Sequence, residues 1–132
     1  MAAKLKGINP YFLVDDVYAS AEYYRDTLGF KFEQFWGEPP KFVMVHRDGL
    51  QIMLRERDGG SESVIKPNRD RVEYALDAYL YCDDANGLHE EFTSKGADVL
   101  SEPYDQPHDC REFELRDMNG YILCFGQDLL AD

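Results

Sequence analysis

Apolar residues recur at helical spacing after Asp16 and predict the first helix of the chain. Val17, Ala21, Tyr24 and Leu28 form one apolar stripe on a helix that runs to about residue 28. The side chain of Asp16 is suited to accept hydrogen bonds from the free backbone N–H groups of the first turn. Asp16 is therefore the predicted N-cap.

A second helix with the same pattern follows Asp84. Ala85, Leu88 and Phe92 lie on its apolar stripe, and the helix is predicted over residues 85–95. Gly96 follows the last turn, where a left-handed residue commonly ends a helix. Each predicted helix thus follows an aspartate and is followed by a glycine, Gly29 in the first case and Gly96 in the second.

Runs rich in β-branched and aromatic residues, separated by turn-forming residues, predict the strands. In the first half they are residues 7–14, 30–36, 42–46 and 51–56. In the second half one begins near residue 75 and includes residues 80–82, and the others are residues 98–100, 111–116 and 121–126. Residues 101–109 contain two prolines and are predicted as a loop.

The predicted elements occur twice in the same order. Asp16 and Asp84 are 68 residues apart, and Gly29 and Gly96 are 67 apart. This long period indicates one supersecondary module used twice. We expect an α+β fold in one domain, residues 1–132, made of two βαβββ modules (about 5–56 and 75–127) joined by a linker (57–74). Two modules that share a core commonly leave a ligand-binding cleft between them.

The net charge of −12 lies mainly in the second half of the chain. Residues 83–132 contain 3 basic and 13 acidic residues, so −10 of the total lies there. Such a surface repels phosphate, which argues against nucleic acids and anionic membranes as partners. It either attracts a cationic ligand or only keeps the protein in solution.

The chain has no apolar run near the roughly 18 residues that a membrane span requires. Its first residues lack the apolar stretch of a signal peptide. The odd number of cysteines, three, does not suggest a disulfide framework. We expect a cytoplasmic protein with reduced thiols.

Two segments carry the resemblance to a known family. One is the strand–helix–strand pattern Val14-x-Asp16-x3-Ser20-x2-Tyr23-Tyr24-Arg25-Asp26-x-Leu28-Gly29-Phe30, and the other is the closing hairpin of residues 111–120. The sequence resembles the vicinal oxygen chelate superfamily, which includes glyoxalase I, extradiol dioxygenases and bleomycin-resistance proteins, and it is most similar to the bleomycin-resistance and glyoxalase-like branch. Met118 stands where this family usually has proline. The resemblance implies paired modules whose sheets form a U-shaped groove.

The resemblance also implies where a divalent metal would bind. Family enzymes use His or Gln from the first strand of each module and Glu from the last strand, and the corresponding residues here are Asn9, Met53, Asp77 and Cys124. Only Asp77 suits a hard divalent metal, because thioether and thiolate ligands prefer softer ions. We therefore expect a groove without metal or other cofactor and no catalytic residue, which favours ligand binding over enzymatic activity.

Two alternatives remain open for this groove. The first is a metal-dependent lyase, isomerase or dioxygenase whose ligands lie one register away, because a slip of one residue turns every side chain of a strand to the other face. The second is a mixed site for copper or zinc. His46, His89 and His108 are predicted to be isolated, solvated side chains, and Cys110 lies in the acidic half, which disfavours a reactive thiolate.

Strand alternation predicts which side chains face the groove. Alternate residues on either side of the four metal positions share their face, and the resemblance adds Trp36, because relatives use aromatic residues near this hairpin. The predicted ligand-binding residues are Asn9, Tyr11, Trp36, Gln51, Met53, Arg55, Asp77, Tyr79, Tyr81, Ile122 and Cys124. Glu112 and Glu114 point away from the apolar face of their strand, toward water or a cationic ligand.

This mixture of tyrosines, amides and charged groups suits an amphipathic organic molecule. We expect a small-molecule-binding protein of the antibiotic-resistance type that takes an aromatic or cationic ligand and is a homodimer. The alternative is that a partner subunit covers the same sheet face.

Overall fold

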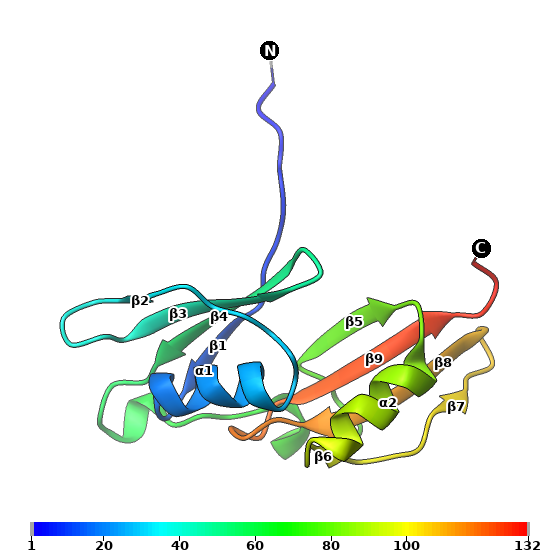
Figure 1. Ribbon diagram of the computed structural model, residues 1–132. Coiled ribbons are helices and arrows are strands. Elements are labelled where there is room, and N and C mark those ends of the chain that lie inside the picture. Colours follow the sequence, from blue (N-terminus) through cyan, green and yellow to red (C-terminus); the bar gives the residue numbers. More distant parts are fainter. Residues whose placement is uncertain (1, 132) are drawn as a thin grey trace.

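The computed structural model describes residues 2–131 and shows two modules side by side, each with a helix packed on a sheet (Figure 1). The first sheet has the order β1-β4-β3-β2, with β1 and β4 parallel. The first module consists of β1 (Tyr11–Val14), α1 (Val17–Asp26), β2 (Phe35–Trp36), β3 (Phe42–Arg47) and β4 (Leu50–Glu56).

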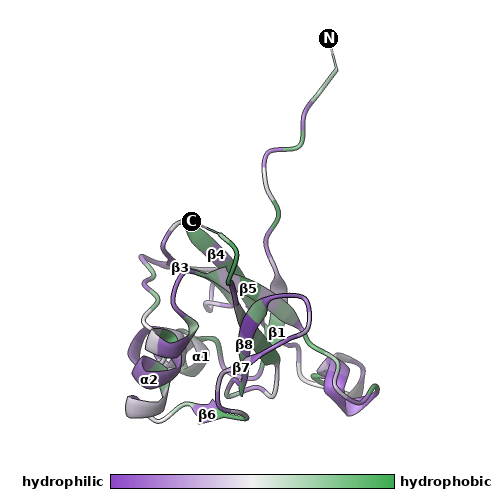
Figure 2. Cartoon of the chain, turned by 90° about the vertical axis from the view of Figure 1, so that its right-hand side faces the viewer, coloured by the Kyte–Doolittle hydropathy of each residue, from purple (hydrophilic) through white to green (hydrophobic). Residues whose placement is uncertain are grey.

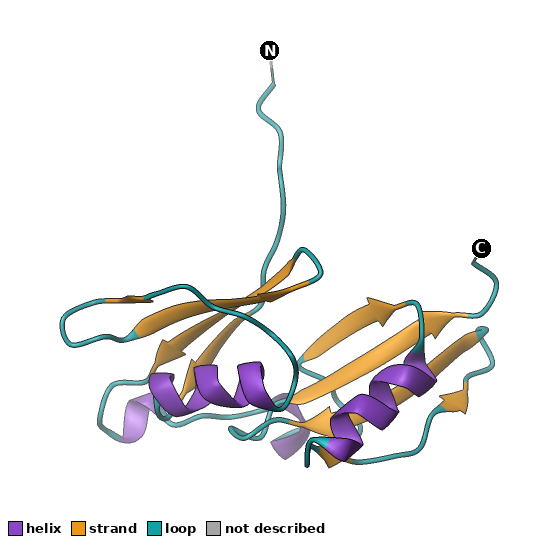
Figure 3. Cartoon of the chain, viewed as in Figure 1, coloured by secondary structure: helices purple, strands orange, loops and turns teal. Residues whose placement is uncertain are grey.

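The second module repeats this arrangement, and both helices lie on the same side of their sheets (Figure 3). Its sheet has the order β5-β9-β8-β6, and β7 pairs with β8. The elements are β5 (Ala78–Cys82), α2 (Ala85–Ser94), β6 (Asp98–Val99), β7 (Tyr104–Asp105), β8 (Cys110–Arg116) and β9 (Ile122–Asp128). The connecting segment holds two short 3-10 turns, η1 (Ser61–Ser63) and η2 (Asn68–Asp70). The expected α+β fold with two βαβββ modules is confirmed.

The predicted N-cap of the first helix is confirmed, and the structure shows an equivalent cap on the second. Asp16 accepts a hydrogen bond from the Ala19 N–H at 3.0 Å, and Asp84 accepts one from the Gly87 N–H at 2.9 Å. Such caps satisfy backbone donors that have no partner within the helix.

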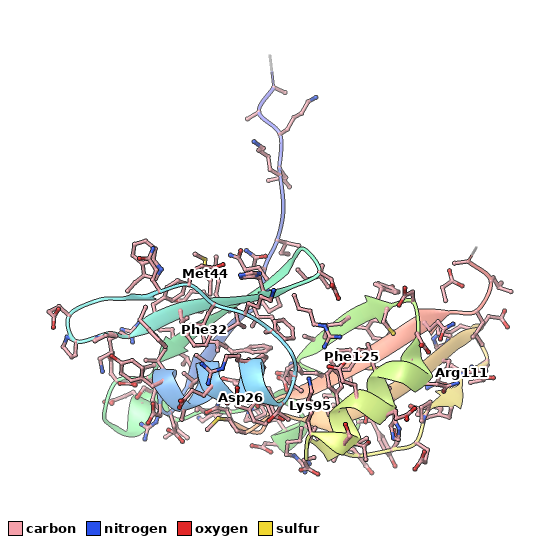
Figure 4. The ribbon with its side chains drawn as sticks, viewed as in Figure 1. Asp26, Phe32, Met44, Lys95, Arg111 and Phe125 are labelled. Carbon is pink, nitrogen blue, oxygen red and sulfur yellow. The ribbon has the colours of Figure 1, made fainter. Side chains whose placement is uncertain are left out.

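Strand alternation separates a core face from an open face in the first sheet. Phe12 and Val14 are buried, with the Phe12 ring stacked on Tyr121, whereas Tyr11 and Leu13 are exposed on the opposite face. Met44 points to the side of the sheet away from α1 (Figure 4). Hydrophobic colouring lies on β4 and other strands but not on β8, which alternates with charged residues, and much of α2 is coloured hydrophilic (Figure 2).

In the second module the core is aromatic. Phe125 lies between β9 and α2 (Figure 4), with its ring centroid 5.3 Å from Phe113 and 5.2 Å from Phe92. Offset and tilted ring pairs at these separations contribute attraction beyond the burial of their area.

Two predicted strands and one predicted loop differ from the structure. The strand expected from residue 7 begins at Tyr11, because Pro10 has no N–H to donate and the chain leaves the sheet before it. The strand expected over residues 30–36 is reduced to Phe35–Trp36 and an isolated bridge from Lys31 to His46. The loop predicted over residues 101–109 contains β7.

Residues 2–9 form an extended arm that leaves the body of the molecule (Figure 1). Leu5 and Ile8 on this arm are almost fully exposed. The expected domain limits, residues 1 and 132, lie outside the described residues. Within residues 2–131, no helix has the length and apolar character needed to cross a membrane.

The two modules are joined by the turn between β8 and β9. The buried carboxylate of Asp117 accepts hydrogen bonds from the Tyr24 hydroxyl of α1 (2.7 Å) and from the backbone N–H groups of Asn119 (2.9 Å) and Tyr121 (3.0 Å). The Tyr121 hydroxyl donates to the Leu13 carbonyl at 2.6 Å. Burial raises the pKa of Asp117 above its usual value, and the hydrogen bonds oppose this shift.

A second polar contact joins the modules at α2. The guanidinium of Arg47, at the end of β3, donates to both carboxylate oxygens of Glu91 at 2.8 and 3.0 Å and to the Leu28 carbonyl at 2.7 Å. A two-point arginine–carboxylate contact restricts orientation as well as distance. Together the two contacts hold the sheets in one relative position.

A glycine on β9 allows a tyrosine of β5 to cross the second sheet. Gly126 pairs with Tyr81 on one side and with Glu112 on the other. The ring of Tyr79 passes over Gly126, so that its hydroxyl reaches Glu112 at 2.6 Å. A Cβ at position 126 would overlap the ring and hydroxyl of Tyr79.

We predict that Tyr24→Phe lowers the free energy of unfolding by about 1.5–3 kcal/mol, the range for hydrogen bonds to charged groups. The substitution removes the only side-chain donor that Asp117 has among the described residues. Urea denaturation measures the loss. Tyr18→Phe is the control, since Tyr18 is half exposed. An equal loss in both variants would contradict the assigned role of Asp117.

We predict that Gly126→Ala destabilises the protein by about 1–3 kcal/mol through overpacking. Combining it with Tyr79→Ala should remove most of this cost, because the clash is then absent, and a double-mutant cycle measures the coupling. Gly7→Ala is the matched control, since a Cβ there has no neighbour within 4 Å. A coupling energy near zero would show that Tyr79 does not occupy this place.

Candidate functional site

A hollow of about 680 Å³ lies between the two modules. It is bounded by the end of the N-terminal arm, the start of β4 and most of β5. The structure brings five predicted residues together there, namely Asn9, Gln51, Met53, Tyr79 and Tyr81. Its volume lies within the usual range of about 300–1,000 Å³ for small-molecule sites.

Tyrosine rings form one wall of this hollow. The ring centroids of Tyr79 and Tyr81 are 5.0 Å apart with an interplanar angle of 60°, and Tyr81 is 75% exposed. On the facing wall Met53 is half-buried, and the Gln51 amide lies 2.9 Å from the Met44 sulfur. The hollow therefore offers flat aromatic area, a deformable thioether and amide groups.

Three other predicted residues lie outside the hollow. Tyr11 packs its ring against Phe42, with the centroids 5.9 Å apart. Arg55 donates to the Glu56 carbonyl and pairs with Asp58 at 3.5 Å. Trp36 is on β2, at the opposite edge of the first sheet from β1.

The three remaining predicted residues are internal parts of the second module. Asp77 accepts hydrogen bonds from the backbone N–H groups of Asn68 at 2.9 Å and Ile122 at 2.8 Å, so both of its oxygens are engaged. Ile122 and Cys124 are fully buried. Burial, with the nearby Glu112 and Glu114, raises the pKa of the Cys124 thiol to about 12.

Glu112 and Glu114 do not face water, which was one of the two alternatives for them. Glu112 is 7% exposed and accepts from Tyr79, and Glu114 forms a two-point ion pair with Arg69 of η2 at 3.0 and 3.1 Å. The connecting segment thus places a cation against this sheet face, a long-range contact that strand alternation does not reveal.

The residues at the family's metal positions do not fit a hard divalent ion. Asn9 and Met53 are weak donors, the Asp77 oxygens already accept backbone hydrogen bonds, and Cys124 is a buried thiol with a raised pKa. A hard ion requires available oxygen or imidazole donors. These four residues suit packing better than coordination.

The prediction of three isolated histidines was wrong. His46 pairs with Glu33 at 2.8 Å, and the ring of His89 meets the Phe113 ring edge-on at 5.3 Å. His108 lies 3.2 Å from Glu112. The side chains of His108, Cys110 and Glu112 place one ligand atom each within 4.8 Å of one another. Strand alternation places Cys110 and Glu112 on one face of β8, but the turn at Asp109 brings His108 to them, and no local sequence signal predicts that approach.

A smaller hollow of about 410 Å³, not predicted from the sequence, lies between β3, β5 and α2. Its walls are mainly apolar, with Phe30, Leu80 and Phe92 among them. The nearest cation, Arg47, is already paired with Glu91. This hollow offers fewer free polar groups than the one beside Tyr79.

Solved structures share this fold at low sequence identity. A glyoxalase-related enzyme from Clostridium phytofermentans matches with a TM-score of 0.76 and 15% identity, covering 96% of this chain and 97% of that one. The bleomycin-binding protein of Streptomyces verticillus, solved with copper(II)-bleomycin, matches with a TM-score of 0.69 and 22% identity over 94% and 97%. TnmS3, an antibiotic-binding protein from Streptomyces sp. CB03234, matches with a TM-score of 0.67 and 18% identity over 96% and 99%. At these identities the likeness shows the fold alone.

The sequence has no significant match among curated proteins. Its family is nevertheless shown by a match that extends over residues 7–125, nearly the whole chain. The expected resemblance is confirmed: the chain belongs to the Glyoxalase/Bleomycin resistance protein/Dioxygenase superfamily.

Proposed function

We propose that this protein binds a small aromatic or cationic organic molecule in the hollow between the modules, without a metal at the family's positions. The observation that carries the proposal is the tyrosine wall of β5 facing Met53 and Gln51 across a space of about 680 Å³. Sites for drug-sized molecules commonly combine such apolar and aromatic walls with a few polar groups.

The tyrosine wall is partly held in place before a ligand arrives. Tyr79 is positioned by its hydrogen bond to Glu112 and by the space above Gly126. A ring that is already ordered loses little conformational entropy on binding. Tyr81 is exposed and adjacent, so a flat ligand group can lie against it.

Charge favours a cationic ligand. Residues 83–132, which build most of the second module, hold −10 of the net charge. The field of such a surface attracts cations and raises their rate of association. Proteins of the same fold that are named for binding bleomycin or another antibiotic support this proposal.

We predict that titration calorimetry with metal-free bleomycin and with flat aromatic cations such as acridines yields saturable binding. Tyr81→Ala should weaken it about tenfold, which corresponds to about 1.4 kcal/mol. Tyr74→Ala is the matched control, because Tyr74 is also exposed and lies outside the hollow. No binding at high micromolar ligand, or an equal loss in both variants, would contradict the proposed site.

We also propose that the protein is a homodimer in which the N-terminal arm docks on a second copy. Leu5 and Ile8 are almost fully exposed on an arm that precedes β1, and the end of this arm also borders the hollow. Apolar side chains of this kind on an extended segment favour association.

We predict a dimeric mass by size-exclusion chromatography with light scattering, and a shift to monomer in Leu5→Asp/Ile8→Asp. Burying two carboxylates without partners opposes docking of the arm. The control is Val72→Asp, an exposed apolar residue of the linker. A monomeric wild-type protein, or an unaltered dimer in the double variant, would refute the arm's role.

The three cysteines are free thiols in the structure. We propose a cytoplasmic location on this basis, because a reducing compartment keeps thiols unpaired.

Residues 57–74 are proposed to act as the linker between the two modules of a single domain.

A further inference from the structure

The β7–β8 hairpin gathers three potential metal ligands at the outer part of the second sheet. Cys110 and Glu112 lie on one face of β8, and His108 lies in the turn that precedes the strand. Nε2 of His108 is 3.2 Å from Oε2 of Glu112, and one donor atom from each of the three residues lies within 4.8 Å of the others.

Backbone contacts fix the turn that carries His108. The Gln106 N–H donates to the Cys110 carbonyl at 2.8 Å, and the Asp109 N–H donates to the Gln106 carbonyl at 3.0 Å. Asp109 adopts a positive φ of 63°, a conformation that Asp tolerates better than most residues. Its carbonyl accepts from the Leu129 N–H at 3.0 Å, which ties the turn to the end of β9.

Glu112 is a buried carboxylate with few compensating charges. It is 7% exposed, and its neutral donors are the Tyr79 hydroxyl (2.6 Å) and the Gln106 amide (3.2 Å). A buried anion is costly unless it is paired or coordinates a cation. Tyr79 donates to Oε2, the oxygen that His108 also approaches, and Gln106 donates to Oε1. Hydrogen bonds to a ligating carboxylate are typical of the groups that surround bound metal ions.

We propose that His108, Cys110 and Glu112 bind one Zn²⁺ ion. Imidazole nitrogen, thiolate sulfur and carboxylate oxygen are the three ligand types that zinc takes in proteins. The side chain of His108 is 60% exposed, so an ion held by the three residues would be reached by solvent, and water would complete its coordination. None of these three residues is at a family metal position, although Glu112 lies near Cys124, and the site goes beyond the proposed ligand binding.

The test is a titration of the full-length, metal-stripped protein with Co²⁺, followed by displacement with Zn²⁺. We expect about one ion per chain, visible absorption typical of a tetrahedral ion and a near-ultraviolet sulfur-to-cobalt charge-transfer band. Cys110→Ser should abolish the charge-transfer band, and His108→Ala should weaken binding at least about tenfold. Elemental analysis after dialysis against Zn²⁺ checks the stoichiometry.

The matched controls are Cys82→Ser and His89→Ala, which change the same residue types elsewhere in the second module. Both should bind Co²⁺ as the wild type does. Because His108 is exposed, His108→Ala is expected to fold, and circular dichroism verifies this for every variant.

Absence of Co²⁺ binding at high micromolar concentration overturns the zinc site, as does a charge-transfer band that survives in Cys110→Ser. An ion retained by the His108→Ala/Cys110→Ser double variant also overturns it, and places the metal elsewhere in the chain. Organic ligand binding measured in metal-free buffer is independent of these outcomes, so the two proposals fail or succeed separately.

Discussion

The buried carboxylate of Asp117 is the contact on which the relation between the two modules depends. It lies in the turn between β8 and β9, yet it accepts a hydrogen bond from Tyr24 of the first module. Removing one partner of a buried charge costs more than the hydrogen bond alone. Since Arg47 and Glu91 hold the modules at a second point, the space between β4 and β5 has a defined shape. The hollow beside Tyr79 follows from these contacts.

The polar side chains on the open face of the second sheet are engaged in contacts within the protein. Tyr79 crosses Gly126 to reach Glu112, and Glu114 is neutralised by Arg69 from the connecting segment. In consequence, the inner part of this face is closed, and the exposed aromatic surface lies at β5. The same arrangement leaves His108 over Glu112 at the outer part of the sheet, with solvent on one side. Family membership alone would direct attention to the inner positions, whose donors are weak or already engaged.

Much of the fold was predictable because its signals are local. Helix stripes, the caps Asp16 and Asp84, and alternation in strands depend on residues within a few positions of one another. The burial of Phe12 and the exposure of Tyr11 follow from alternation alone. The repeat also indicated which positions of the two modules are equivalent. The strand registers agree with it, since Tyr11 is opposite Met53 in the first sheet and Tyr79 is opposite Cys124 in the second.

The sequence by itself thus determined the element order, the paired modules and which side of each strand faces the core. Only the tertiary structure decided which of the outward residues share one site. Trp36 lies at the far edge of its sheet, Asp77 caps backbone groups, and Glu112 meets His108 and Tyr79 instead of water. The physical reason is that alternation specifies the face of a strand, whereas hydrogen bonds and ion pairs between distant segments specify what covers that face.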